Sequence, residues 1–191
     1  MWAVVGLGNP GSEYAGTRHN AGFAFVQGVA RAWDVRIKKR KFQARTAETV
    51  RGREAVLLAQ PQTYMNASGQ SVRLILQGTG LDADRLVVVY DDLDIRLGEV
   101  RVRGGGRAGT HKGMQSIVAE IGTTRFPRIR IGIGPLPEGE DASDFVLAPF
   151  AHDERPLFDA SLERARQALD LVLAGRLERA MTAFNQKAEE S

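Results

Sequence analysis

Short apolar runs alternate along the chain with longer stretches in which apolar residues recur at helical spacing. The apolar runs predict strands, which lie at residues 2–5, 42–50, 54–59, 86–90, 99–102 and 128–134. The amphipathic stretches predict helices, which lie near residues 23–33, 72–78, 114–121, 156–173 and 177–184. This alternation is typical of an α/β fold, and we predict a three-layer sandwich in which helices cover both faces of a mixed, twisted sheet. We expect one domain over residues 1–191, with a frayed tail at 185–191.

A few residues predict the structure of the first helix and of the segment after it. The apolar face of the helix is expected to hold Phe23, Val26, Ala30 and Trp33. Residues 36–41, Arg-Ile-Lys-Lys-Arg-Lys, then form a basic run, and we expect a loop there. Because a run of charge in a loop has no fixed geometry, simple solvation is favoured over contact with phosphate.

The composition is that of an ordinary globular protein without membrane segments. A chain of 191 residues, of which 43% are hydrophobic and 26% are charged, is long enough to bury a sizeable core. No apolar run approaches the length of a membrane span, and the N-terminus lacks the pattern of a signal peptide. The chain has no cysteine, which excludes disulfides and thiol nucleophiles and is compatible with the cytoplasmic location that we expect.

Positive charge is concentrated in the first 135 residues. Residues 1–135 carry 20 Lys and Arg against 11 Asp and Glu, whereas residues 136–191 carry 6 against 12. The densest basic region is 101–130, with seven Lys and Arg and one acid, Glu120. A basic body with an acidic end suits a polyanionic partner that binds one face, and chance asymmetry of a solvated surface is the alternative.

The stretch from Gly6 to Asn20 joins the first predicted strand to the first helix. Asn9-Pro10-Gly11 is turn chemistry, and the polar loop after it delivers His19 to the start of the helix. Ligands of open α/β sheets bind beyond the carboxyl ends of strands, so this loop is a candidate site. Residues 6–11 also match G-x-G-x-x-G, the dinucleotide fingerprint. A nicotinamide site is disfavoured, because the fingerprint needs the glycines to open the helix and a long polar loop intervenes here.

A second candidate site lies where the apolar strand 86–90 ends in Asp91-Asp92-Leu93-Asp94. Three carboxylates within four residues suit a divalent cation, but no partner ligands accompany them, so we expect no metal. Side chains alternate along a strand, so Asp91 and Asp92 cannot both face one site if the strand continues that far.

A glycine-rich loop carries the third candidate site. Residues 103–113, Arg-Gly-Gly-Gly-Arg-Ala-Gly-Thr-His-Lys-Gly, precede a predicted helix, and glycine backbone with two arginines suits an anion. The loop lacks the Gly-Lys-Ser/Thr ending of a P-loop, so a nucleoside triphosphate is not expected. Asn66 lies at another strand-to-helix junction, where a helix N-cap is the alternative to a role in the site.

Together these candidate sites resemble the peptidyl-tRNA hydrolase family of bacteria. The resemblance rests on three strings in the family's order, GLGNPGSEYAGTRHNAGF, PQTYMNASG and the glycine-rich loop. It covers residues 2–150 strongly and the C-terminal helices weakly. The resemblance implies hydrolysis of the ester that joins a peptide to the 3′ ribose of tRNA, with no cofactor.

By this resemblance, His19 is the catalytic base, and Asp91 orients it and stabilises its charged form. Asn9 and Asn66 would bind the peptide and polarise the carbonyl group, and Asn66 would help to position the attacking water. Histidine side chains titrate near pH 6.5 in model peptides, so a neutral imidazole is available as a base at cytoplasmic pH. Without the resemblance, His19 is equally well read as an N-terminal helix residue with no chemistry.

The resemblance also implies residues that hold the tRNA end. Arg103 and Arg130 fall where basic residues clamp a terminal phosphate of tRNA. The family usually has His-Asn-Gly where this chain has His111-Lys112-Gly113, so the role of that asparagine cannot be carried over. We expect Lys112 still to serve the substrate, with a side chain that lies in solvent as the alternative. Tyr14 and Tyr64, which lie within the first two strings, complete the candidate substrate-binding set.

The expected partner is peptidyl-tRNA, bound at its acceptor end and terminal phosphate by a monomer that does not associate with membranes. Residues 143–147, Ser-Asp-Phe-Val-Leu, match a lid-like helix of the family. A serine nucleophile is disfavoured because no G-x-S-x-G string occurs. The alternative from another class is an RNA-binding relative that has lost hydrolysis, which the intact His19 and Asp91 disfavour.

Overall fold

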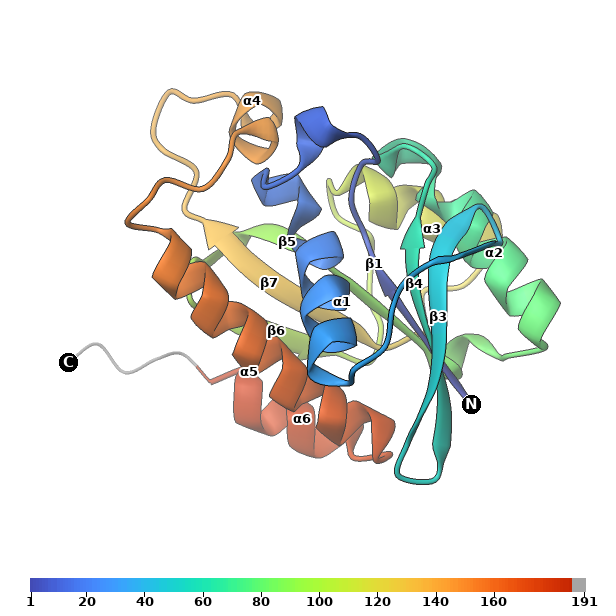
Figure 1. The fold of residues 1–191 in the computed structure, drawn as a ribbon. Helices are drawn as coiled ribbons and strands as arrows, with labels where there is room; N and C mark the ends of the chain where they lie inside the picture. Colours follow the sequence, from blue (N-terminus) through green and yellow to red (C-terminus); the bar gives the residue numbers. More distant parts are fainter. Residues whose placement is uncertain (187–191) are drawn as a thin grey trace.

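A seven-stranded mixed sheet forms the middle layer of the molecule, and helices cover both of its faces (Figure 1). The structure is a computed structural model that describes residues 1–186. Its strands are β1 Trp2–Gly6, β2 Lys39–Lys41, β3 Ala44–Arg51, β4 Glu54–Pro61, β5 Leu86–Arg96, β6 Val100–Arg103 and β7 Arg128–Gly134. The predicted three-layer α/β sandwich is confirmed.

The strand order β2-β3-β4-β1-β5-β7-β6 places parallel strands at the centre and antiparallel strands at both edges. β4, β1, β5 and β7 are parallel neighbours, whereas β2 and β3 at one edge and β6 at the other run antiparallel to their neighbours. The carboxyl ends of the four parallel strands therefore meet at one end of the sheet. This is where ligands bind in open α/β sheets.

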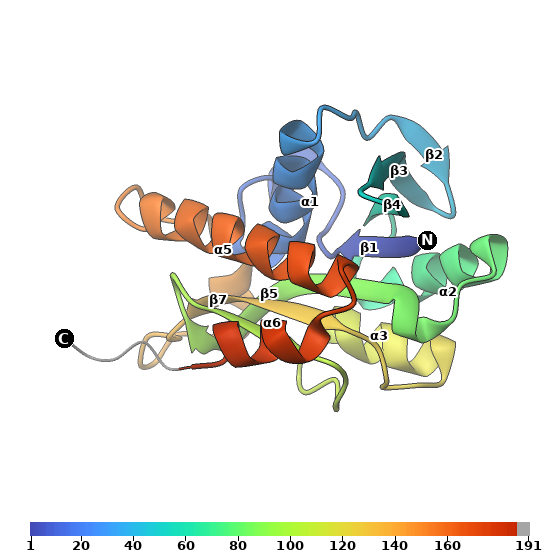
Figure 2. The same cartoon turned by 90° about the horizontal axis from the view of Figure 1, so that it is seen from below.

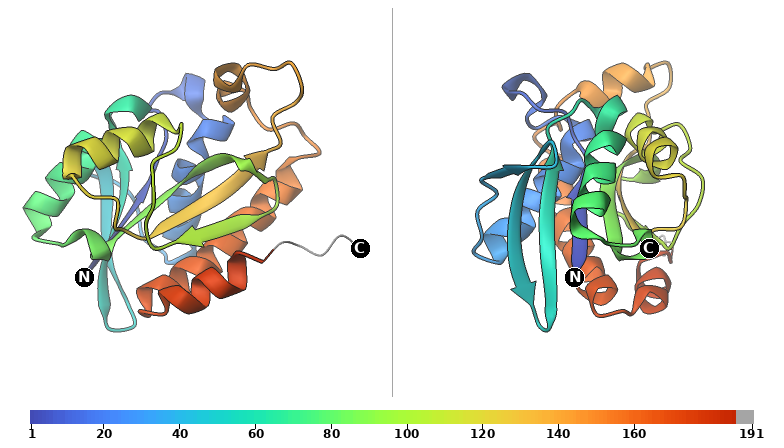
Figure 3. Two further views of the ribbon diagram at one scale, coloured as in Figure 1. Left: turned by 180° about the vertical axis from the view of Figure 1, so that it is seen from behind. Right: turned by 90° about the vertical axis from the view of Figure 1, so that its right-hand side faces the viewer.

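The helices divide between the two faces of the sheet (Figures 2 and 3). One face is covered by α1 Ala21–Ala32, α5 Arg155–Leu173 and α6 Leu177–Phe184, and the other by α2 Ser68–Thr79 and α3 Lys112–Ile121. A short helix, α4 Ala142–Leu147, lies at the carboxyl end of the sheet beside the loop after β1 (Figure 1). Within residues 1–186, none of the helices combines the length and the hydropathy that a membrane span requires.

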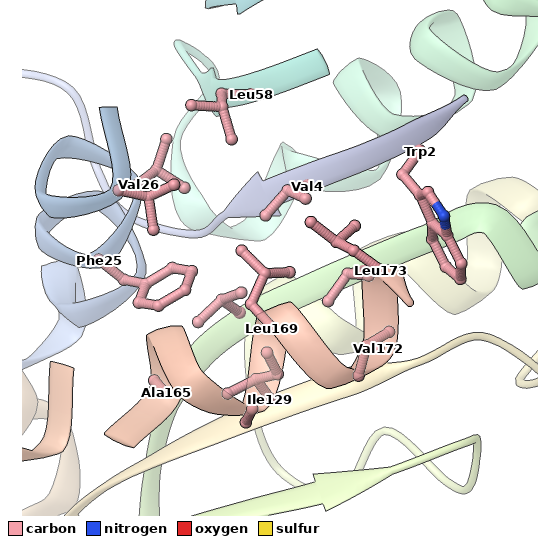
Figure 4. Close-up of a cluster of buried hydrophobic side chains, with 14 of the residues drawn as sticks. Trp2, Val4, Phe25, Val26, Leu58, Ile129, Ala165, Leu169, Val172 and Leu173 are labelled. Atoms are coloured by element: carbon pink, nitrogen blue, oxygen red, sulfur yellow. The ribbon is translucent and has the colours of Figure 1, made fainter. Parts of the chain in front are cut away.

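The larger core lies between the sheet and the helices α1 and α5 (Figure 4). Val4 of β1, Leu58 of β4 and Ile129 of β7 are buried there with Phe25 of α1 and Leu169 of α5. Alternate residues of the same central strands face α2 and α3 in a second core. The central strands are thus buried on both faces, which explains why their sequence runs are apolar without a break.

The start of α1 meets the end of β1 backbone to backbone. A Cβ built on Gly22 would lie 2.3 Å from the main-chain nitrogen of Leu7 and 2.4 Å from the carbonyl oxygen of Val89. Because Gly22 faces the sheet, the buried side of α1 includes Phe25, and Phe23 is only half-buried. The predicted apolar face of this helix is therefore wrong at Phe23.

The basic run is a loop only over residues 36–38, because Lys39–Lys41 forms the edge strand β2, so the predicted loop is wrong for the second half of the run. This strand pairs with β3 through a turn in which Phe42 and Gln43 have φ angles of 59° and 51°. The Phe42 ring packs so closely on Gly78 of α2 that a Cβ there would lie 2.3 Å from it, and Oγ of Ser71 donates a hydrogen bond to the Phe42 carbonyl. This packing holds Phe42 in a turn instead of the predicted strand, and it gives the basic run a fixed backbone geometry.

The end of α6 is tied to the edge strand β6 through Asn185. The Asn185 side chain accepts a hydrogen bond from the N–H of Val102 and donates one to the Val102 carbonyl, each at 2.8 Å. These bonds use backbone groups that an edge strand otherwise leaves open. Asn185 therefore does not belong to the predicted frayed tail, and residues 187–191 of that tail lie outside the described residues.

We expect Gly22→Ala to destabilise the protein by about 1–3 kcal/mol or more, because the added methyl group would meet main-chain atoms that no rotamer change can move. Gly28→Ala is the matched control, since Gly28 lies in the same helix and its Cβ would meet only the end of Arg31, at 4.0 Å. That change should stabilise the protein by about 0.5–1 kcal/mol. Urea unfolding measures both, and equal stability of the two variants would contradict the close approach.

Candidate functional site

A cleft of about 730 Å³ opens at the carboxyl ends of β1 and β5. Its walls come from the loop after β1, the segment after β4, β5 itself, the glycine-rich loop and α4. Of the predicted site residues, the lining includes Asn9, His19, Tyr64, Asn66, Asp91, Arg103, Lys112 and Arg130. Tyr14 is not in the lining, but its ring packs edge-on against Tyr64 with ring centroids 6.4 Å apart. Residues predicted from separate segments thus come together in one place.

The carboxylate of Asp91 holds two imidazoles. Its Oδ2 lies 2.8 Å from Nδ1 of His19, and its Oδ1 lies 3.0 Å from Nε2 of His111. An ionised carboxylate only accepts hydrogen bonds, so both of these ring nitrogens donate. The other nitrogen of His111 accepts from the N–H of Met114 at 3.3 Å, whereas Nε2 of His19 has no hydrogen-bond partner among residues 1–186. A neutral His19 therefore carries a free lone pair, which a general base needs.

The pKa of Asp91 is lowered from its ordinary value even though only 2% of the residue is exposed. Burial alone raises the pKa of a carboxyl group, because it disfavours the charged form. The electrostatic attraction of His111 and the hydrogen bonds from His111 and His19 outweigh the effect of burial. Asp91 therefore stays ionised in the pH range where imidazoles titrate, and it stabilises positive charge on either ring.

His111 is a site residue that the sequence reasoning missed. It lies at the N-cap of α3, and its ring centroid is 5.0 Å from that of His19. Its place in the glycine-rich string was visible, but nothing along the chain showed that it would reach Asp91. The available signal was its position. His111 lies beside Lys112 at a predicted helix start, just as His19 lies at the start of the first predicted helix.

Two asparagines close the loop after β1. The N–H of Asn9 donates to Oδ1 of Asn20 at 2.9 Å, and Nδ2 of Asn20 donates to the Asn9 carbonyl at 3.0 Å. Oδ1 of Asn9 accepts from the N–H of Met65 at 2.7 Å, which leaves Nδ2 as a donor without a partner in the described part of the chain. This loop separates the glycines of residues 6–11 from α1, so the dinucleotide fingerprint does not apply here, as its spacing indicated.

Asn66 is exposed in the 3₁₀ turn Met65–Ala67, just before α2. The N-cap of α2 is Ala67, and no side chain caps this helix. The alternative interpretation of Asn66 as a capping residue is therefore wrong. Its amide lines the cleft and has no hydrogen-bond partner within residues 1–186.

The basic side of the cleft comes from β6 and β7. Nε of Arg130 lies 2.7 Å from Oδ2 of Asp92, and Arg103 is exposed beside this pair. Arg128, to which the sequence reasoning gave no role, is buried and holds the glycine-rich loop by donating to the carbonyl groups of Gly106, Arg107 and Thr124. Asp91 and Asp92 thus take different partners, as alternation predicts. Both nevertheless line the cleft, so the expectation that they cannot share a site is wrong.

Lys112 is the first residue of α3 and lines the cleft beside His111. Its side chain is exposed and makes no hydrogen bond or ion pair with the described residues. The ammonium group is therefore available to a ligand.

A metal ion would find three donors in the cleft. One ligand atom from each of His19, Asp91 and His111 lies within 4.8 Å of the others, and two imidazoles with a carboxylate are typical of zinc sites. These donors are hydrogen-bonded to one another, so a metal would have to replace both bonds to Asp91. The expectation that no partner ligands accompany the acidic run is therefore wrong for Asp91, whereas Asp94 is not part of this group.

The chain matches known proteins over nearly its whole length. A family model described as peptidyl-tRNA hydrolase matches residues 3–191. The chain belongs to the peptidyl-tRNA hydrolase family. The peptidyl-tRNA hydrolase of Alkaliphilus metalliredigens is 44% identical to it over 185 residues, which are 97% of this chain and 100% of the relative. That of Chloroflexus aurantiacus is 45% identical over 186 residues, which are 97% of this chain and 99% of the relative.

Solved structures of peptidyl-tRNA hydrolases share the fold. The crystal structure of the enzyme from Acinetobacter baumannii superposes with a TM-score of 0.90 at 37% identity, and the match covers 97% of this chain and 94% of that one. A complex of peptidyl-tRNA hydrolase with N-propanol gives a TM-score of 0.92 at 36% identity, over 100% of this chain and 97% of that one.

In this member of the peptidyl-tRNA hydrolase family, a buried arginine ties the segment of His19 to α4. Nη2 of Arg18 donates to Oε2 of Glu154 at 2.7 Å, and Nη1 lies 3.4 Å from the carbonyl oxygen of Phe145 in α4. The guanidinium carbon lies 4.2 Å from the centroid of the Phe145 ring. Because α4 forms part of the cleft wall, Arg18 fixes that wall relative to the neighbouring His19.

We expect Glu154→Gln to loosen α4 and to lower the free energy of unfolding by about 1–3 kcal/mol, because the change removes the charge that Arg18 binds. Amide hydrogen exchange over residues 142–148 should accelerate. Glu138→Gln is the control, since Glu138 is exposed in the loop before α4 and makes no ion pair with the described residues. Unchanged exchange in the Glu154 variant would show that α4 does not depend on Arg18.

Proposed function

We propose that this protein hydrolyses the ester bond between the peptide and the 3′ ribose of tRNA in peptidyl-tRNA. The observation that carries the proposal is the difference between the two imidazoles on Asp91, of which only His19 has a free nitrogen. Cations on one flank of His19 and amides on the other suit an ester that joins RNA to peptide. Relatives named peptidyl-tRNA hydrolase, which match the chain over nearly its whole length, support the proposal.

In the proposed mechanism, Nε2 of His19 takes a proton from water while the water oxygen attacks the ester carbonyl carbon. The bond from that carbon to the ribose oxygen then breaks, and the proton passes from the imidazolium to the departing oxygen. Asp91 holds Nδ1 and stabilises the imidazolium between the two transfers, as the acid of a hydrolase triad does. General-base action of this kind is typically worth about 10²–10⁴ in rate.

Asn9 and Asn66 are proposed to bind the reacting end of the peptide. The free Nδ2 of Asn9 is a donor that can polarise the ester carbonyl, and the amide of Asn66 can position the attacking water. Tyr14 and Tyr64 pack on each other at the rim, where they would contact the peptide. These roles need free amide groups at the cleft, which are Nδ2 of Asn9 and the side-chain amide of Asn66.

Arg103, Arg130 and Lys112 are proposed to bind the acceptor end of tRNA. Arg103 and Arg130 lie on neighbouring strands and line the same cleft, so they can share a terminal phosphate. Lys112 lies nearer to His111 and can meet either a phosphate or the negative charge that develops on the ester oxygen. We propose that the protein acts in this way as a monomer, since all of these groups come from one chain. We also propose that it acts in the cytoplasm.

An RNA-binding protein that has lost hydrolysis is the alternative function. It would bind tRNA and release no peptide from peptidyl-tRNA. The bond between His19 and Asp91 favours hydrolysis, because RNA binding alone has no use for an imidazole oriented by a buried carboxylate. Release of labelled peptide separates the two functions in a single assay.

We expect His19→Ala to reduce kcat by about 10²-fold or more, because it removes the only proposed proton acceptor. Binding of deacylated tRNA, measured by fluorescence anisotropy, should persist. His111→Ala should lose only part of the activity, since it leaves His19 on Asp91. His152→Ala is the control, because His152 is exposed and does not line the cleft. A His19→Ala variant that retained more than a few per cent of kcat would overturn the mechanism.

We expect Arg103→Ala/Arg130→Ala to raise KM for full-length peptidyl-tRNA and to flatten its dependence on salt, because each lost phosphate contact lowers the salt slope by about 0.7–0.9. A short peptidyl-nucleoside substrate should be almost unaffected. Arg53→Ala/Arg125→Ala is the control with the same change in charge, since both residues are exposed and lie outside the cleft. An equal rise in KM for the long and the short substrate would show that Arg103 and Arg130 do not bind a phosphate of tRNA.

A further inference from the structure

A second cleft, of about 580 Å³, lies on the other side of the loop after β1. It is formed by that loop together with α1, β3, β4 and the start of α5. Asn9 lines both clefts, so the two clefts are neighbours. None of the roles proposed above uses any other residue of its wall.

Three glutamines give the second cleft a fixed polar wall. Nε2 of Gln27 donates to Oε1 of Gln60 at 3.1 Å, and Nε2 of Gln60 donates to the carbonyl of Phe23 at 2.9 Å. Nε2 of Gln62 lies 3.2 Å from the Gln60 carbonyl. Their amide nitrogens are thus engaged with the protein, while the side-chain oxygens of Gln27 and Gln62 have no partner within residues 1–186.

The free oxygens of this wall can accept hydrogen bonds from a ligand that donates them. An extended peptide carries one N–H for nearly every residue, and side-chain oxygens can accept from it. The phosphates of RNA only accept hydrogen bonds, so they gain nothing from the free oxygens of Gln27 and Gln62. The aromatic side chains of Phe23, Phe150 and Phe158, which also line the cleft, offer apolar surface to the side chains of a peptide.

Charged side chains of the second cleft come from two elements, Arg45 of β3 and the oppositely charged Arg155 and Asp159 of α5. Arg45 of β3 lines the cleft, is exposed and has no acidic partner among the described residues. Arg40 of β2 lies directly opposite Arg45 in the strand register, so two like charges share one face of the sheet. Like charges in this arrangement repel each other. An acidic group bound between them would relieve that repulsion.

From these observations we infer that the second cleft binds the peptide portion of peptidyl-tRNA, beyond the residue that carries the ester, and favours acidic side chains near Arg45. The inference rests on the proposed function. Arg103 and Arg130, two of the three cations assigned to tRNA, lie on β6 and β7, on the far side of His19 from this cleft. A substrate held there by its RNA end directs its peptide toward Asn9 and into the second cleft.

The test compares Arg45→Glu with the unchanged protein on three substrates that share one tRNA. They carry an acidic hexapeptide, a lysine-containing hexapeptide and a single N-acetylated amino acid. We expect kcat/KM for the acidic hexapeptide to fall about two- to fivefold relative to that for the lysine hexapeptide, the size expected for exposed charge pairs. The single amino acid should be unaffected. Arg53→Glu is the matched control, since Arg53 is exposed in the turn between β3 and β4 and lies outside both clefts.

A second variant tests occupancy without changing charge. Ala15→Trp places a large ring in the wall of the cleft, at an exposed position, and should raise KM for both hexapeptides but not for the single amino acid. Equal effects on all three substrates, or none on any, would overturn the inference. Weaker binding of deacylated tRNA by Arg45→Glu would assign the cleft to RNA instead. If the unchanged protein hydrolysed none of the three substrates, the proposed function itself would fail.

Discussion

The buried carboxylate of Asp91 is the constraint on which the site depends. Moving such a charge out of water costs several kcal/mol unless donors replace the water. Its two donors, His19 and His111, stand at the ends of different loops, one after β1 and one before α3. The charge is therefore well placed only when both loops are folded. The contacts that make its burial tolerable are also the contacts that orient the ring of His19, so the stability and the reactivity of the site have the same origin.

Because of the order of the strands, the two flanks of His19 differ in chemical character. On one flank, the antiparallel strand β6 extends the sheet beyond β7 and carries the exposed Arg103, while the buried Arg128 of β7 holds the glycine-rich loop. On the other flank, β4 and α1 contribute uncharged amides, such as Gln60 and Gln27. Asn9 lies between the flanks, because the contact of Gly22 with the end of β1 fixes where the loop leaves the sheet. A substrate that is RNA at one end and peptide at the other matches this division.

Most of the fold could be predicted from the sequence because the central strands are buried on both faces and read as unbroken apolar runs. The strand Lys39–Lys41 could not, since its place depends on Phe42 meeting Gly78 across the chain, and no local pattern encodes that contact. The residues of the candidate site that carry the family resemblance were predicted from the sequence. The roles of His111 and Arg128 were missed, because each depends on a partner that only the folded sheet brings near.

The bond between Arg18 and Glu154 spans 136 residues of sequence, and it has a consequence for the order in which the molecule forms. Contacts of such long range are made late, because the intervening chain must be ordered first. During synthesis from the N-terminus, the segment of His19 leaves the ribosome well before the residues that fix α4 exist. A growing chain of this protein is itself a peptidyl-tRNA, and its own cleft is completed only when most of that chain has been made. The wall of the cleft that α4 forms is therefore fixed only after Glu154 has been added to the chain.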